Sequence, residues 1–331
     1  MRTSRWFRLG LVALGIAVVA AGSLAFVRLR DPASSRAAAA SAVSRTVIAG
    51  ELAHTPWFGM TLLHADISFR EGRLRGAPPP SVPATASILV DLDSGQILWE
   101  RNPYERLPMA STIKVLTAMV ALHNFSLTQP ITVTPDALFQ AGDESKMFLK
   151  AGETLSTREL LTGMLMVSAN DAADVLAIDT VGMERFVGTM NAQTRALGLN
   201  DTHVVTPVGL DAPDQYSSAY DLAVLSAVDV DTFPAFGDIV RTRQAYLPST
   251  ATHPAFYLNN INLLLGMYPA AVGLKTGYTG NAGACEIGMA VRNGHRLLSV
   301  VLSGHLVYTE SRRLLDWGFV QEGLPSQLPA P

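Results

Sequence analysis

The chain has 331 residues, of which 48% are hydrophobic, and its formal net charge at pH 7 is −3. The charged residues are scattered along the sequence, which argues against a nucleic-acid-binding protein. The single cysteine, Cys285, excludes an intrachain disulfide, and its apolar neighbours predict an inert core residue instead of a catalytic thiol. The seven histidines lack metal-ligand spacing, so we expect neither a metal nor another cofactor.

The N-terminal part predicts a membrane segment. Three arginines precede the apolar stretch 9–27, which is about long enough to cross a bilayer as a helix. We therefore assign residues 1–30 to an N-terminal membrane anchor or signal segment. The best small-residue cleavage site, within 37–42, lies well beyond the apolar stretch and favours an uncleaved anchor. Secretion after cleavage is the alternative.

Residues 31–79 are predicted to form a stalk or linker, because they are first rich in Ala, Ser and Arg and then mixed, up to a proline-rich stretch. The apolar patch 56–63 argues against complete disorder in this stalk. It either packs on the following domain or lies on the membrane surface. Residues 80–320, about 240 in number, suffice for one well-buried catalytic domain. Residues 321–331 are predicted to be a tail without a further domain.

The domain is predicted to have strands at both ends of its sequence and helices between them. Strand-like patterns end at the turn signal Asn293-Gly294 and begin again after it. This order indicates an α+β domain, an antiparallel sheet flanked by helices with an inserted helical lobe and a site at their junction. The predicted elements are a hairpin near 89–100, a buried helix at 110–122, a helical middle, strands at 270–279, 283–291 and 296–304, and a helix at 308–319.

A first polar motif lies in the helix 110–122, which has almost no polar face. Ser111 and Lys114 are three residues apart, so they share one helix face and the amine can reach the hydroxyl. Burial disfavours the ammonium, and a neutral amine can activate a serine as a nucleophile. A lysine that extends to the surface beside a helix-capping serine would have the same spacing. The motif alone does not decide between these interpretations.

The second motif, Ser168-Ala169-Asn170, follows an apolar helical run and precedes a new helix. It is therefore predicted to lie on a turn between two helices. A hydroxyl and an amide in such a turn can pass a proton and hold a peptide group. Plain helix capping is the alternative.

The third motif, Lys275-Thr276-Gly277, lies within the predicted strand 270–279. Its lysine and threonine offer a charge and a hydroxyl to a carboxylate, and its glycine allows a ligand to approach the backbone. A phosphate-loop interpretation fails because the Lys-Thr pair precedes the glycines of the segment instead of following them.

The three motifs, in this order, resemble those of the penicillin-binding serine D-alanyl-D-alanine carboxypeptidases, which are relatives of the serine β-lactamases. The resemblance covers residues 80–319 and implies a β-lactamase/transpeptidase-like fold. Further matching segments are 89–100, 108–114, 147–152, 167–172, 209–213 and 273–279.

The resemblance implies a set of catalytic roles. Ser111 would attack the carbonyl of the penultimate D-alanine and form an acyl-enzyme, with Lys114 as its base. Ser168 would relay a proton to the leaving amine, and Asn170 would orient the substrate amide.

The resemblance also implies a substrate site. Lys275 and Thr276 would bind the terminal carboxylate, with Gly277 beside them. The backbone N–H groups of Ser111 and Tyr278 would form the oxyanion hole. The implied partners are peptidoglycan stem peptides ending in D-Ala-D-Ala and β-lactam antibiotics as covalent inhibitors. The catalytic domain would therefore lie on the extracytoplasmic side of the cell membrane.

Two positions depart from the family pattern. Val208 stands where a histidine or aspartate is frequent, and Tyr220 stands where an arginine is usual. The second change either removes a cation near the carboxylate end of the site or replaces a structural arginine.

Two other functions remain as alternatives. A class A β-lactamase needs a Glu-x-x-Leu-Asn segment between the second and third motifs. The only glutamate there, Glu184, lacks the following Leu-Asn, so rapid penicillin hydrolysis is not expected. A catalytically inactive peptidoglycan- or β-lactam-binding sensor would use the same pocket, but every chemical position is filled.

Overall fold

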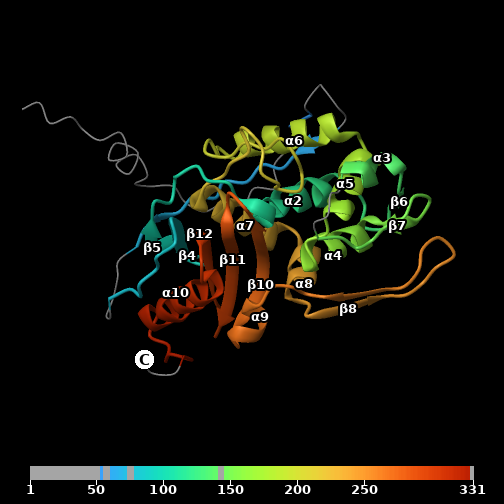
Figure 1. The fold of residues 1–331 in the computed structure, drawn as a ribbon. Helices are drawn as coiled ribbons and strands as arrows, with labels where there is room; N and C mark the ends of the chain where they lie inside the picture. The colour runs from blue at the N-terminus through green and yellow to red at the C-terminus, as the bar shows by residue number, and fades with distance from the viewer. Residues whose placement is uncertain (1–52, 55–59, 73–77, 141–144, 329–331) are drawn as a thin grey trace, which may run out of the picture. The chain divides into compact units, whose positions relative to one another are not determined.

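The computed structural model describes residues 53–54, 60–72, 78–140 and 145–328 (Figure 1). The predicted membrane segment 1–30 lies outside these residues, as does much of the predicted stalk. Within the described ranges, no helix has both the length and the apolar character needed to cross a bilayer.

A sheet with the strand order β10-β11-β12-β4-β5-β3 forms the centre of the described chain. All neighbouring strands in it are antiparallel except β3 and β5, which are parallel. The last three strands end within one residue of their predicted bounds, and the two ends of the domain meet where β12 pairs with β4. The strands are β3 (Arg70–Glu71), β4 (Ala86–Asp91), β5 (Gln96–Arg101), β10 (Ala271–Thr279), β11 (Gly283–Arg292) and β12 (His295–Gly304).

Helices cover both faces of this sheet, which is why its central strands are apolar on both sides. In β12, Leu298 and Val300 belong to one hydrophobic cluster, whereas Leu297 and Val301 belong to another. The alternation follows from the two-residue repeat of a strand. On the first face lie α7 (Ala219–Thr232) and α8 (Pro234–Arg241), and on the second lie α9 (Leu264–Met267) and α10 (Val307–Gln321).

The residues between β5 and α7 form the predicted helical lobe, seen beside the sheet in Figure 1. One of its helices begins with a capping box, in which the side chains of Ser156 and Glu159 satisfy each other's backbone N–H groups. The lobe consists of the 3₁₀ turn η1 (Ala110–Ile113), α2 (Lys114–Asn124), β6 (Pro130–Thr132), α3 (Pro135–Gln140), β7 (Thr154–Ser156), α4 (Thr157–Met166), α5 (Asn170–Ile178) and α6 (Met183–Ala196).

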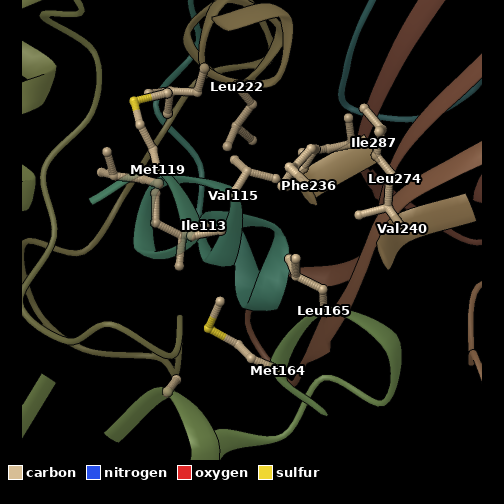
Figure 2. Close-up of a cluster of buried hydrophobic side chains, with 14 of the residues drawn as sticks. Ile113, Val115, Met119, Met164, Leu165, Leu222, Phe236, Val240, Leu274 and Ile287 are labelled. Atoms are coloured by element: carbon tan, nitrogen blue, oxygen red, sulfur yellow. The ribbon is translucent and has the colours of Figure 1, made fainter. Parts of the chain in front are cut away.

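Lobe and sheet share one core around α2. Figure 2 shows Val115 and Met119 of α2 together with Leu165 of α4, Leu222 of α7 and Ile287 of β11. Every α2 residue from 114 to 121 is buried, as predicted from its uniformly apolar composition. This core therefore fixes the start of α2 against the third predicted motif on β10.

Part of the predicted stalk packs on this domain. Met60, Leu63 and Phe69 belong to the main hydrophobic cluster. The backbone of Leu63 exchanges two hydrogen bonds with the side chain of Gln193, at 2.8 and 2.7 Å. Of the two placements considered for the apolar patch 56–63, its described part therefore lies on the domain. The remaining strands are β1 (Ala53–His54), β2 (Thr61–Leu62), β8 (Gln244–Leu247) and β9 (Phe256–Asn259).

Candidate active site

Ser111 and Lys114 lie together at the start of the buried helix. The sequence predicts one helix here, but the structure begins it with the 3₁₀ turn η1, which carries Ser111, and α2 starts at Lys114. Lys114 is fully buried, and its Nζ donates a hydrogen bond to Ser111 Oγ at 2.9 Å. The neighbouring Ala110 has a positive φ of 50°, a backbone conformation that costs free energy and is typical of functional sites. The predicted approach of amine to hydroxyl is present.

The second motif holds the same amine from the opposite side. It lies between the end of α4 and the start of α5, as predicted. Lys114 Nζ donates to the carbonyl oxygen of Ser168 at 3.0 Å and to Asn170 Oδ1 at 2.5 Å. Ser168 has a positive φ of 59°, so a second strained residue borders the amine. These acceptors fix Nζ between the hydroxyls of Ser111 and Ser168.

The third motif contributes a second buried lysine. Lys275 Nζ donates to Ser168 Oγ at 2.9 Å and to the carbonyl oxygen of Thr276 at 2.7 Å. Burial lowers the pKa of Lys275 to about 7, and the nearby Glu286 carboxylate opposes this shift. Ser168 thus joins the two amines and provides a path along which a proton can pass.

Gly277 lets β10 lie directly on the turn that carries Ser111. A Cβ atom at Gly277 would lie 2.7 Å from the backbone nitrogen of Ser111 and 2.9 Å from Ala110 Cβ. A side chain here would therefore clash with η1. Because Gly277 has no Cβ, the end of the edge strand β10 can lie next to the backbone N–H of Ser111.

The edge of β10 is the natural place for an oxyanion hole. The carbonyl of Thr276 accepts a hydrogen bond from Lys275 Nζ, so it points away from β11. Backbone groups two residues apart on a strand point to the same edge, so the N–H of Tyr278 also lies on the open side. The Tyr278 side chain is 75% exposed. The backbone N–H of Tyr278 thus follows directly after Gly277, where β10 lies against the backbone of Ser111.

Thr276 faces the opposite side of the sheet from Lys275. Its Oγ1 lies 2.7 Å from the hydroxyl of Tyr308, at the start of α10. Glu286 stands opposite Thr276 in the β10–β11 register and is fully buried, and burial raises its pKa well above the usual range. The sequence analysis did not identify Tyr308 or Glu286. Glu286 could have been noticed in the sequence, because it is a carboxylate within a largely apolar predicted strand.

The two departures from the family pattern have different surroundings. The backbone carbonyl of Val208 accepts a hydrogen bond from Ser111 Oγ at 3.4 Å, while the Val208 side chain is buried. Tyr220 packs against the rings of Phe69 and Tyr104, and its hydroxyl accepts a hydrogen bond from the backbone N–H of Phe69. These contacts favour a structural role at position 220.

Glu184 and Cys285 are the remaining residues considered in the sequence, and Cys285 stands opposite Gly277 in the β10–β11 register. Glu184 is exposed in the first turn of α6, where an activated water beside Ser111 would not be expected. Cys285 is buried, and burial raises the pKa of its thiol to about 11, in agreement with an inert core residue.

Comparison with known proteins identifies the family. Residues 74–305 match the family model described as D-alanyl-D-alanine carboxypeptidase. The D-alanyl-D-alanine carboxypeptidase DacB2 of Mycobacterium tuberculosis is 38% identical over 250 residues, which are 73% of this chain and 84% of that protein. DacF of Bacillus subtilis is 31% identical, over 72% of this chain but only 62% of its own length.

Solved structures show the same fold. A D-alanyl-D-alanine carboxypeptidase from Mycobacterium tuberculosis aligns with a TM-score of 0.70 and 36% identity, over 78% of this chain and 98% of that structure. The Streptomyces K15 DD-transpeptidase aligns with a TM-score of 0.69 and 25% identity, over 74% of this chain and all of that structure. The predicted β-lactamase/transpeptidase-like fold is thereby confirmed. The chain belongs to the D-alanyl-D-alanine carboxypeptidase family of penicillin-binding serine hydrolases.

Proposed function

We propose that this serine D-alanyl-D-alanine carboxypeptidase removes the terminal D-alanine of peptidoglycan stem peptides through an ester on Ser111. The observation that carries the proposal is the 2.9 Å contact between Lys114 Nζ and Ser111 Oγ, both of which lie where β10 meets α2. A serine needs an adjacent base to become a nucleophile, and a buried amine at this distance provides one.

Acylation begins when the neutral Lys114 amine takes the proton of Ser111 Oγ. The oxygen attacks the carbonyl carbon of the penultimate D-alanine, and the backbone N–H groups of Ser111 and Tyr278 stabilise the resulting oxyanion. Such donors typically contribute about 3–4 kcal/mol each to the transition state. Asn170 orients the substrate amide during this step.

Breakdown of the intermediate releases D-alanine. As the C–N bond breaks, the leaving amine receives a proton that passes from Lys114 through Ser168 Oγ, and Lys114 returns to its neutral form. The hydrogen bonds from Lys114 and Lys275 to Ser168 support this relay. Water then gives a proton to Lys114 and attacks the ester, and Ser111 leaves with that proton.

The substrate's chain end is recognised by Lys275 and Thr276. The terminal carboxylate would lie at the open edge of β10, an edge strand, where a protonated Lys275 attracts it from one face of the strand and the Thr276 hydroxyl donates to it from the other. β-Lactams carry a carboxylate and a strained amide in place of the peptide, so they acylate the same serine.

We also propose that residues 1–30 anchor the protein in the cell membrane, with residues 31–79 as the linker and 80–320 as the extracytoplasmic catalytic domain. The apolar stretch 9–27 supports this placement. Fractionation of cells that produce the full chain tests it. The full chain is expected in the membrane fraction, and a chain lacking residues 1–30 is expected outside it.

Purified full-length protein, incubated with a peptide ending in D-Ala-D-Ala and separately with a fluorescent penicillin, tests the activity. We expect release of one D-alanine per peptide and a fluorescent label that decays slowly. Rapid penicillin destruction without D-alanine release would indicate a β-lactamase. Labelling without any turnover of the peptide would indicate a sensor.

A further inference from the structure

The loop that contains Gly209 and Asp211 has no part in the chemistry above, yet it contacts both η1, which carries Ser111, and the end of β10. The Asp211 carboxylate accepts a hydrogen bond from Thr279 Oγ1 at 2.7 Å and another from the backbone N–H of Asn281 at 3.1 Å. Thr279 is the last residue of β10, and Asn281 lies in the turn to β11. Asp211 therefore holds the end of the strand that carries Tyr278.

The other end of this loop lies on the nucleophile's helix. Gly209 has a φ of 87°, and a Cβ at this position would lie 2.0 Å from the carbonyl oxygen of Ala110. The carbonyl of Pro207 accepts a hydrogen bond from Thr117 Oγ1 of α2 at 2.6 Å. Pro207 and Gly209 therefore hold the loop against η1 and α2, and Asp211, two residues further on, joins the loop to β10.

The end of β10 is also paired with β11, in which Ala284 stands opposite Tyr278 and Gly283 opposite Thr279. The Tyr278 side chain is 75% exposed and so adds little packing. The Thr279 hydroxyl, which donates to Asp211, also accepts a hydrogen bond from the backbone N–H of Ala282, so the turn closes around the same pair. The Asp211 side chain thus connects the β10–β11 turn to the loop that contains Gly209.

We propose that Asp211 is a positioning residue that sets the distance between the backbone N–H groups of Ser111 and Tyr278, and with it the oxyanion hole. This inference rests on the proposed function. Oxyanion donors act only when they lie about 2.7–3.1 Å from the developing charge. A misplacement of about 1 Å can lower a rate by about 100-fold. Loss of the hydrogen bonds that Asp211 accepts from Thr279 and Asn281 therefore weakens binding of the transition state more than binding of the substrate.

Three variants of the full-length protein test this role. Asp211→Asn keeps the shape of the side chain but replaces one acceptor oxygen by an N–H donor. Thr279→Val leaves the carboxylate in place but removes the hydrogen bond to Asp211 and the one that the hydroxyl accepts from the backbone N–H of Ala282. Asp214→Asn is the matched control, because Asp214 belongs to the same loop, carries the same charge and has a positive φ of 61° that asparagine tolerates.

For Asp211→Asn we expect kcat on the D-Ala-D-Ala peptide, and the rate of acylation by fluorescent penicillin, to fall about 10- to 100-fold, with KM changed less than about twofold. Thr279→Val is expected to show a smaller fall in kcat. The fall in kcat of the double variant should be smaller than the product of the two single falls, because both changes break the hydrogen bond between Thr279 and Asp211. Asp214→Asn should behave as wild type.

Wild-type kcat in both Asp211→Asn and Thr279→Val would overturn the proposal. A change in KM alone would also overturn it, because it would mean that the Asp211 charge acts on substrate binding. Should Asp211→Asn fail to fold, the kcat of Thr279→Val decides. Failure of the proposed function would instead appear as activity that survives in Ser111→Ala, whatever Asp211 does.

Discussion

Lys275 Nζ lies 2.9 Å from Ser168 Oγ, and this hydrogen bond connects the sheet to the helical lobe across a separation of 107 residues in sequence. It connects the residue proposed to bind the substrate carboxylate with the residue proposed to pass a proton to the leaving amine. Recognition of the chain end and departure of D-alanine are thereby linked through one serine hydroxyl.

The first prediction concerns pH and Lys275. Because the pKa of Lys275 is lowered to about 7, the amine loses its positive charge as the pH rises through neutrality. The ratio kcat/KM, which reports ionisations of the free enzyme, should therefore fall above about pH 7 for peptides with a terminal carboxylate. Lys275→Arg keeps a charged side chain at all these pH values and should lose this decline. A decline unchanged in Lys275→Arg would assign it to another group.

The second prediction concerns Glu286 and stability. Its pKa is raised in the folded protein, so the folded state keeps a proton that the unfolded state has lost above its ordinary value of 4.5. This difference makes wild type lose stability as the pH rises above that value. Glu286→Gln imitates the protonated acid, so we expect it to be more stable than wild type at pH 8 by about 1 kcal/mol or more, with little difference near pH 4.

Urea unfolding of both proteins at pH 4 and pH 8 measures the effect of Glu286→Gln. Glu105→Gln is the matched control, because Glu105 is exposed and lies outside the helices, so the same chemical change there should leave stability unaltered at both pH values. A Glu286→Gln variant that is less stable than wild type at pH 8 would show that the buried carboxylate is charged and stabilising.

The third prediction concerns the close contact at Gly277. Gly277→Ala would place a methyl group 2.7 Å from the Ser111 nitrogen and 3.1 Å from that of Thr112, and backbone atoms cannot move away cheaply. We expect a loss of about 1–3 kcal/mol in unfolding free energy and slower acylation by penicillin. Gly280→Ala, three residues on, is the control, since its added Cβ meets nothing within 4 Å. Equal effects in the two variants would contradict a specific contact with η1.

The fourth prediction concerns the partner of Thr276. Tyr308→Phe removes the hydroxyl that lies 2.7 Å from Thr276 Oγ1 and leaves the ring in place. Without this hydrogen bond the threonine hydroxyl keeps only its longer contact with the Cys285 carbonyl, at 3.4 Å, so KM for a carboxylate-ended peptide should rise about fivefold, in line with a net contribution near 1 kcal/mol. Tyr246→Phe, on the exposed hairpin β8–β9, should leave KM unchanged. An unaltered KM in Tyr308→Phe would exclude Tyr308 from orienting Thr276.

Local sequence rules predicted the elements that carry the motifs. The strand pattern around Asn293-Gly294 placed β11 and β12, and both turn residues have the positive φ that a tight hairpin turn requires. The turn between α4 and α5 was likewise predicted from the end of an apolar helical run and the start of a new helix, although α5 begins after Ala169 without a side-chain cap. These features depend on residues near one another in the sequence, which is why they could be predicted.

Contacts between distant segments could not be predicted in this way. The segment 60–72 has no periodic pattern, yet Phe69 reaches the main core and Arg70 pairs with β5. The contact of Thr276 with Tyr308 depends on how α10 packs on the sheet, which local sequence patterns do not define. The hydrogen bond from Thr279 Oγ1 to Asp211 spans 68 residues and requires the folded loop.

The most direct test of Ser111 as the nucleophile is mass spectrometry of the penicillin-treated full-length protein. We expect one penicilloyl group, located after digestion on the peptide that contains Ser111 and absent from Ser111→Ala. Lys114→Met, which removes the base, should acquire the same group about 100- to 10,000-fold more slowly. An adduct on any other residue, or an undiminished adduct in Ser111→Ala, would contradict the central role of this hydroxyl.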